Sequence, residues 1–147
     1  MSDVAAQKTP WHLWAVGILS LLWNAMGAFD YTVTQLRVEA YMAQFTQAQL
    51  DFFYGFPQWV VATWAIAVWF SVLGSVYLLL RKPAAVSLFW VSLVAMLATA
   101  LHNFGLSDVS MADVAGAEAI AFSIAIGVVA AGLVYYSTRL RNAGVLR

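Results

Sequence analysis

The chain has 147 residues, of which 63% are hydrophobic and 10% are charged, a composition much more apolar than that of soluble domains. Its net charge is zero, which excludes a protein-wide positive field that would attract nucleic acid. It has no cysteine, which excludes disulfides and thiolate chemistry. The composition therefore predicts an integral membrane protein with the lipid bilayer as its main partner.

Four apolar segments are long enough to cross a bilayer as helices, because about 20 helical residues span its hydrocarbon core. These segments cover residues 11–29, 57–80, 84–104 and 115–137. The link Arg81-Lys82-Pro83 is so short that the second and third segments must form an antiparallel hairpin. The predicted fold class is all-α, with residues 1–147 forming a single membrane domain built as a four-helix bundle.

The first segment allows a second interpretation. Lys8, the apolar run and the small residues Ala25 and Gly27 are typical of a signal peptide with its cleavage site. The length of the run and its three tryptophans favour a retained span instead.

Residues 30–56 form the long connection between the first two spans. Thr46 and Gln49 have the spacing of a capping box, which predicts a short helix from Gln47 to Tyr54. Before it, apolar residues interspersed with Arg37 and Glu39 predict a loosely amphipathic helix that continues from the first span. The connection is too aromatic for a free linker, so we expect it to cap one end of the bundle.

The charged residues orient the bundle. Six of the seven Lys and Arg residues fall at one end, namely Lys8, Arg81, Lys82, Arg139, Arg141 and Arg147. The other end holds Arg37 among the acidic residues Asp30, Glu39, Asp51, Asp108, Asp113 and Glu118. By the positive-inside rule, both termini are predicted to be cytoplasmic and the cap extracytoplasmic.

Small residues recur at every fourth position of two spans. They are Ala67, Ser71 and Ser75 in the second span, and Ala119, Ser123, Gly127 and Ala131 in the fourth. This spacing is typical of helices whose backbones approach closely in lipid. We therefore expect a larger side chain at Gly127 to push a neighbouring helix away and destabilise the bundle.

Polar residues gather near the predicted extracytoplasmic ends of the spans. The candidate ligand-binding residues are Asn24, Asp30, Gln58, His102, Asn103 and Glu118. In a ligand site, His102 would act as donor, acceptor or ligand, with Asp30 or Glu118 as its carboxylate partner. In the alternative interpretation, which the sequence favours, these residues close helix ends and hydrogen-bond to water and lipid headgroups.

Catalytic and cofactor signatures are absent from the sequence. It contains no Gly-x-Ser-x-Gly elbow, no glycine-rich phosphate loop and no pair of histidines with metal-ligand spacing. His12 and His102 are expected at opposite membrane faces, which argues against bis-histidine haem within one chain. We therefore predict no enzyme activity, no cofactor and no metal.

Two functions are compatible with these features. The first is a small membrane binding or accessory protein with a polar site at the extracytoplasmic end. The alternative is a small-solute transporter, with sugars among its candidate substrates, that acts as a parallel homo-oligomer. Coupled transport usually uses an ionisable residue at mid-membrane, and the predicted spans contain none there. A homo-oligomer or a larger membrane complex is the expected protein partner.

Several segments carry a resemblance to a known family. They are WNAMGAFDYTVTQ at 23–35, EAYM at 39–42, FYGFP at 53–57 and the stretch 69–81. With them the chain resembles a family of small four-span proteobacterial membrane proteins, largely uncharacterised, of which some members carry an automatic sugar-transporter label. The similarity covers most of the chain and is densest between residues 22 and 82. The resemblance implies a location in the bacterial inner membrane and assigns no catalytic or binding residues.

Overall fold

The computed structural model describes residues 8–147, which form α-helices and one short π-helix without any β-strand in that range. The long helices are α1 (Trp11–Gln35), α4 (Gln58–Leu79), α5 (Ala84–Leu101) and α6 (Met111–Asn142). All four are long and apolar enough to cross a membrane, α5 together with the π-helix that follows it. The prediction of an all-α, four-helix membrane bundle is confirmed. The N-terminal end, residues 1–7, whose predicted side is cytoplasmic, lies outside the described residues.

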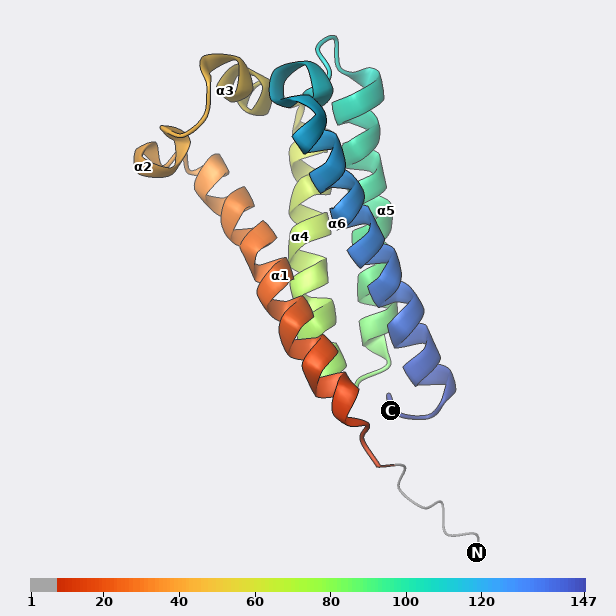
Figure 1. The fold of residues 1–147 in the computed structure, drawn as a ribbon. Helices are drawn as coiled ribbons and strands as arrows, with labels where there is room; N and C mark the ends of the chain where they lie inside the picture. The colour runs from red at the N-terminus through yellow and green to blue at the C-terminus, as the bar shows by residue number, and fades with distance from the viewer. Residues whose placement is uncertain (1–7) are drawn as a thin grey trace, which may run out of the picture.

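The bundle has two unlike ends. One end, called here the terminal end, holds the α4–α5 turn at residues 80–83 and the C-terminal segment 143–147 (Figure 1). The other, called the cap end, holds α2 (Glu39–Met42), α3 (Gln47–Tyr54) and the π-helix η1 (His102–Leu106). Helix α4 packs against both α1 and α5, and α5 packs against α6. Helix α1 diverges from the others toward the cap end, where α3 contacts α6 (Figure 1).

Helix α1 continues past residue 29, so the first part of the predicted cap is helical and extends the first span. It ends in a Schellman turn, in which the Val38 N–H donates to the Val33 carbonyl at 3.0 Å. Arg37 takes the left-handed position of this turn with φ 51°, where glycine is the usual residue. Its guanidinium lies 4.2 Å from the centre of the Tyr54 ring, which ties the end of α1 to α3.

The helix starts at the cap end follow capping rules. Thr46 Oγ1 accepts from the Gln49 N–H at 3.3 Å, and Gln49 Oε1 accepts from the Thr46 N–H at 3.0 Å. The predicted capping box and the helix Gln47–Tyr54 are therefore confirmed. A second capping box, between Ser110 and Asp113, starts α6 at Met111, ahead of the predicted span. Gly116 then kinks α6 with φ 70°, a backbone conformation that glycine adopts without strain.

Helices α1 and α4 are joined by a buried polar network. Asn24 Nδ2 donates to the Ser71 carbonyl at 3.2 Å and to Ser75 Oγ at 3.0 Å. The hydroxyls of Ser20 and Ser75 lie 3.0 Å apart and hydrogen-bond to each other. Such contacts hold helices together in lipid, where these groups have no water to bind.

Helices α4 and α5 are joined in the same way. Ser92 Oγ donates to the Ala67 carbonyl at 2.6 Å, and the hydroxyls of Thr63 and Thr99 lie 2.9 Å apart. The small residues of the second span therefore face neighbouring helices, as the sequence predicts.

The prediction for the small residues of the fourth span is wrong. A Cβ added at Gly127 would meet only the flexible tip of Met96, at 3.8 Å, which is ordinary contact. The buried residues of α6 begin only at Leu133, so most of this helix lies loosely beside α5. Closer approaches occur at glycines of the other spans: an added Cβ would lie 2.6 Å from Phe89 Cε1 at Gly74 of α4, and would overlap the flexible side chain of Leu79 at Gly17 of α1.

The terminal end is closed by an apolar core. Its buried residues are Leu13, Leu78, Ala85, Val86, Phe89, Leu133, Val134, Leu140, Val145 and Leu146. The last two belong to the C-terminal segment, which folds back beneath the helices. The Arg147 N–H donates to the Arg81 carbonyl at 2.7 Å, and Arg81 Nε donates to the Val145 carbonyl at 3.3 Å. Within residues 8–147, apolar side chains therefore fill the middle of this end.

Candidate functional site

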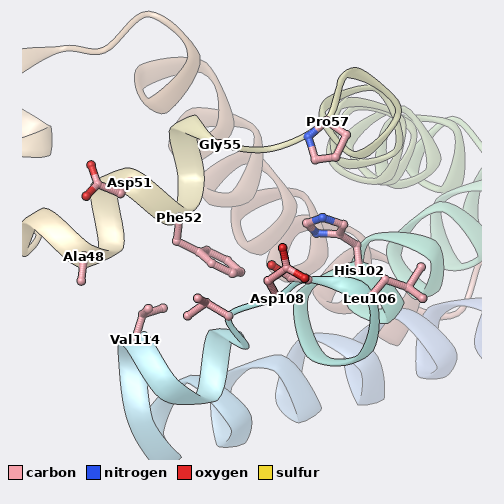
Figure 2. Close-up of a pocket in the computed structure, with 11 residues that line it drawn as sticks. Ala48, Asp51, Phe52, Gly55, Pro57, His102, Leu106, Asp108 and Val114 are labelled. Carbon is pink, nitrogen blue, oxygen red and sulfur yellow. The ribbon is translucent and has the colours of Figure 1, made fainter.

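An open pocket of about 580 Å³ lies at the cap end. Its walls come from α3, the link to α4, η1, the loop after η1 and the first turns of α6 (Figure 2). The lining residues are Ala48, Asp51, Phe52, Gly55, Pro57, His102, Leu106, Ser107, Asp108, Val109 and Val114. The pocket therefore combines two stretches that are far apart in the sequence, residues 48–57 and 102–114.

His102 is the buried polar side chain of this pocket, with only 8% of its surface exposed. The rings of Phe56 and Trp59 pack edge-on against the imidazole, with centres 5.5 and 5.6 Å away. Its Nδ1 has a long contact of 3.4 Å to Asn103 Oδ1. Within residues 8–147 its Nε2 has no hydrogen-bond partner. The aromatic packing thus fixes a ring whose second nitrogen remains available.

The backbone around His102 is unusual. The Ser107 N–H donates to the His102 carbonyl at 3.0 Å, five residues back, which is the π-helical pattern. A π-turn widens a helix and is rare, and single π-turns occur frequently at functional sites. Here it ends α5 and leads directly into the pocket loop at Ser107 and Asp108.

Two carboxylates lie at the solvent-exposed rim of the pocket. Figure 2 displays Phe52, Asp108 and His102 around its centre, with Asp51 further out on α3. Asp51 accepts a hydrogen bond from Gln47 Nε2 at 2.7 Å, and Asp108 has no hydrogen-bond partner within residues 8–147. Phe52 is nearly buried and supplies an apolar wall. The arrangement is a buried imidazole between an apolar wall and an anionic rim.

Two of the six sequence candidates belong together at this site. His102 lines the pocket, and Asn103 is its neighbour in η1. Gln58 is exposed at the first residue of α4, and Glu118 is exposed on α6 beyond the kink. Neither of these lines the pocket.

The two candidates on α1 do not line this pocket. Because α1 runs to Gln35, Asn24 lies near the middle of the helix and is used in packing against α4. Asp30 does not line the pocket, and its Oδ1 accepts from the Tyr41 hydroxyl at 2.5 Å. The carboxylates that line the pocket with His102 are Asp51 and Asp108, whereas Asp30 and Glu118 lie outside its lining.

The bond between Asp30 and Tyr41 fastens α2 to α1. Burial, the hydrogen bond to Asp30 and the negative charge of Asp30 together raise the pKa of Tyr41 to about 12. The phenol therefore stays protonated and keeps donating to Asp30 at neutral pH. This bond and the contact of Arg37 with Tyr54 stabilise the path of the chain into α3.

Sequence reasoning missed Asp51 and Asp108, although it identified the elements that carry them. Asp51 lies within the helix that the capping box predicts, and Asp108 follows His102 by six residues. Asp51 and Asp108 come close to His102 only because α3 passes over the end of the bundle, and the spacing of residues in the sequence does not predict that path. Within residues 8–147, no group of three or more His, Asp or Glu side chains is arranged to hold a metal ion.

The chain matches no protein-family model, and comparison with curated proteins and with solved structures gives no significant match. The geometry of the pocket is therefore the basis for assigning a function.

Proposed function

We propose that this chain is an integral membrane binding or accessory protein that holds a small ligand in the cap-end pocket. The observation that carries the proposal is His102, a nearly buried imidazole with one free nitrogen in an open pocket, at the start of a π-turn. A merely interfacial histidine would expose its ring to water and headgroups. His102 instead is fixed between Phe56 and Trp59 and lines a space large enough for a small molecule.

The distribution of charge supports an orientation for this site. Six of the seven Lys and Arg residues lie at or beside the terminal end, which by the positive-inside rule faces the cytoplasm. The pocket then opens on the extracytoplasmic side of the bacterial inner membrane. That location agrees with the resemblance to small four-span proteobacterial membrane proteins, and membership of that family forms part of the proposal.

The closed terminal end favours binding over transport. Transport requires a polar path that can open toward both sides of the membrane. The polar groups between α1 and α4 hydrogen-bond to one another, and the C-terminal segment packs Val145 and Leu146 into the apolar core. A small-solute transporter, as a parallel homo-oligomer, would need a large rearrangement of this end.

A thermal-shift experiment on the purified protein tests the proposal. The probes are a panel of small organic cations, small carboxylates and neutral sugars, each added at saturating concentration. At a hundred times its Kd, a ligand of the folded state adds about 2.7 kcal/mol of stability. We expect at least one probe class to raise the melting temperature in a saturable way.

Two tryptophan variants locate the effect. Ala48→Trp places a large ring at the exposed edge of the pocket and should abolish the stabilisation. The control, Gln44→Trp, adds the same ring to an exposed residue of the cap end that does not line the pocket. A ligand site in this pocket would be contradicted if no probe raised the melting temperature, or if Ala48→Trp and Gln44→Trp reduced the stabilisation equally.

A further inference from the structure

We infer that the ligand of the cap-end pocket is an organic cation, an ammonium or guanidinium group attached to a small apolar body. This inference rests on the proposed function and specifies its ligand class. The first observation is the sign of the lining charges. Asp51 and Asp108 both line the pocket, and no Lys or Arg of residues 8–147 does so.

The two carboxylates are not neutralised by the protein itself. Asp51 accepts only from the uncharged amide of Gln47, and Asp108 accepts from no group within the described chain. The basic residue of the cap end, Arg37, is directed to the ring of Tyr54. A positive ligand would therefore meet two available carboxylates, whereas an anion would be repelled by both.

The interior of the pocket supplies the second, independent observation. His102 is 92% buried and lines the cavity, and its Nε2 has no partner among residues 8–147. In the tautomer with a free Nε2 lone pair, this atom accepts a hydrogen bond from an ammonium or guanidinium N–H. A ring nitrogen that reaches the pocket and has no partner in the described chain is free to bind a polar ligand atom there.

The apolar wall determines the rest of the ligand. Phe52 and Val114 face the same space from α3 and α6. An aromatic face attracts a cation, and both side chains gain from burial against hydrocarbon. A cation with an apolar body would therefore pair with the carboxylates of the rim, donate to the imidazole and pack against the apolar wall. A bare metal ion does not, because residues 8–147 offer no set of three ligands.

Three probes that share one phenyl ring separate charge from shape. They are 2-phenylethylammonium, neutral 2-phenylethanol and anionic 3-phenylpropionate, titrated by calorimetry into the purified full chain in neutral detergent near pH 7. We expect the ammonium probe to bind at least about fivefold more tightly than the alcohol, and the carboxylate most weakly. Added salt should reduce this preference, because the carboxylates lie at an exposed rim.

Charge variants assign the preference to the pocket. Asp108→Asn should weaken binding of the ammonium probe about fivefold and leave the alcohol nearly unchanged, with a smaller effect in Asp51→Asn. The matched control is Glu39→Gln, which removes one negative charge from an exposed residue of the same end, outside the pocket. It should leave both affinities within about twofold of the unchanged protein. Circular dichroism melting curves verify that each variant is folded.

Failure of this inference can be told apart from failure of the proposed function. If the alcohol or the carboxylate binds most tightly, and Ala48→Trp abolishes that binding, the pocket is a ligand site but not for cations. If the ammonium probe binds equally well to Asp108→Asn, the inference is also overturned. If none of the three phenyl probes binds, and no member of the wider panel of cations, carboxylates and sugars raises the melting temperature, both the cation site and the proposed function are contradicted.

The cation could be a free amine or the ammonium headgroup of a lipid. Titration into nanodiscs distinguishes these sources, because phosphatidylethanolamine carries an ammonium group and phosphatidylglycerol does not. Weaker apparent binding of 2-phenylethylammonium in phosphatidylethanolamine discs would identify the headgroup as a competitor for the same site. Equal binding in both discs would identify a free amine. Each result supports a cation site, whereas loss of binding in both discs would contradict it.

Discussion

Gly74 gives the sharpest test of how the bundle is packed. A Cβ at this position would lie 2.6 Å from Cε1 and 2.7 Å from Cδ1 of the Phe89 ring, whereas carbon atoms in contact prefer about 3.5 to 4.0 Å. The ring would have to move by about 1 Å. Phe89 is only 2% exposed and belongs to the terminal-end core, so little free space can absorb this shift.

The expected cost follows from this geometry. Overpacking of a dense core costs about 1 to 3 kcal/mol. Alanine also favours a helix over glycine by about 1 kcal/mol, which would mask part of that cost. Gly127→Ala is the matched control, because it gains the same helix preference but meets only Met96 at 3.8 Å. We therefore expect Gly74→Ala to be about 1 to 3 kcal/mol less stable than Gly127→Ala.

Reversible unfolding in mixed micelles, with increasing SDS and far-ultraviolet circular dichroism as the signal, measures this difference. Phe89→Leu introduces a smaller side chain and should by itself lower the free energy of unfolding. In the double variant, however, Gly74→Ala should cost less stability than it does beside Phe89. Equal stability of Gly74→Ala and Gly127→Ala would refute the reasoning. It would mean that α4 and α5 separate without cost where the structure packs them most closely.

Three further predictions concern other parts of the chain. Asn24→Ala should lower the free energy of unfolding by about 0.5 to 2 kcal/mol in the same assay, because Ser75 loses its hydrogen bond from Asn24, and ligand binding to the pocket should not change. A loss of ligand binding with unchanged stability would instead indicate that Asn24 contacts the ligand. The difference between ultraviolet titrations of the unchanged protein and of Tyr41→Phe should show that Tyr41 ionises near pH 12. Because an unperturbed tyrosine has a pKa near 10, the bond of Tyr41 to Asp30 should stabilise the fold fully below about pH 10 and lose this effect as the pH rises toward 12. Asp30→Asn should move this titration part of the way back, and a pKa near 10 in the unchanged protein would contradict the Asp30 bond. A reporter fused after Arg147 should be cytoplasmic and a tag inserted after Asp108 extracytoplasmic, and the reverse result would overturn the proposed orientation.

The helices were predictable because each has a strong local signal. Long apolar segments mark all four spans, and the Thr46 and Gln49 pair marks α3 by a contact within a single turn. The end of α1 was not predictable, because the left-handed residue that follows a helix is usually a glycine, and here it is Arg37. Its left-handed conformation accompanies the contact with Tyr54, which lies 17 residues away in the chain.

The length of α1 decides where the candidate Asn24 lies. With the span ending at residue 29, Asn24 falls close to the extracytoplasmic surface; with α1 running to Gln35, it lies deep in the bundle. His102 was found because its own span ends near it. Asp51 and Asp108 join it through the path of α3, a tertiary feature that hydropathy and spacing do not encode.

Helix α1 packs closely on α4 but loosely on α6, and an apolar cavity of about 550 Å³ lies between α1 and α6. The polar residues of α1 are satisfied by α4, so no hydrogen bond holds α1 to α6 in the middle of the bundle. The two helices meet through His12 and Tyr136 near the terminal end, and through the rings of Trp23 and Phe122 further along. Beyond that point α3, rather than α1, contacts α6. The cap-end pocket lies there, between α3, the loop after η1 and the first turns of α6 ahead of the Gly116 kink, with the His102 imidazole in its wall.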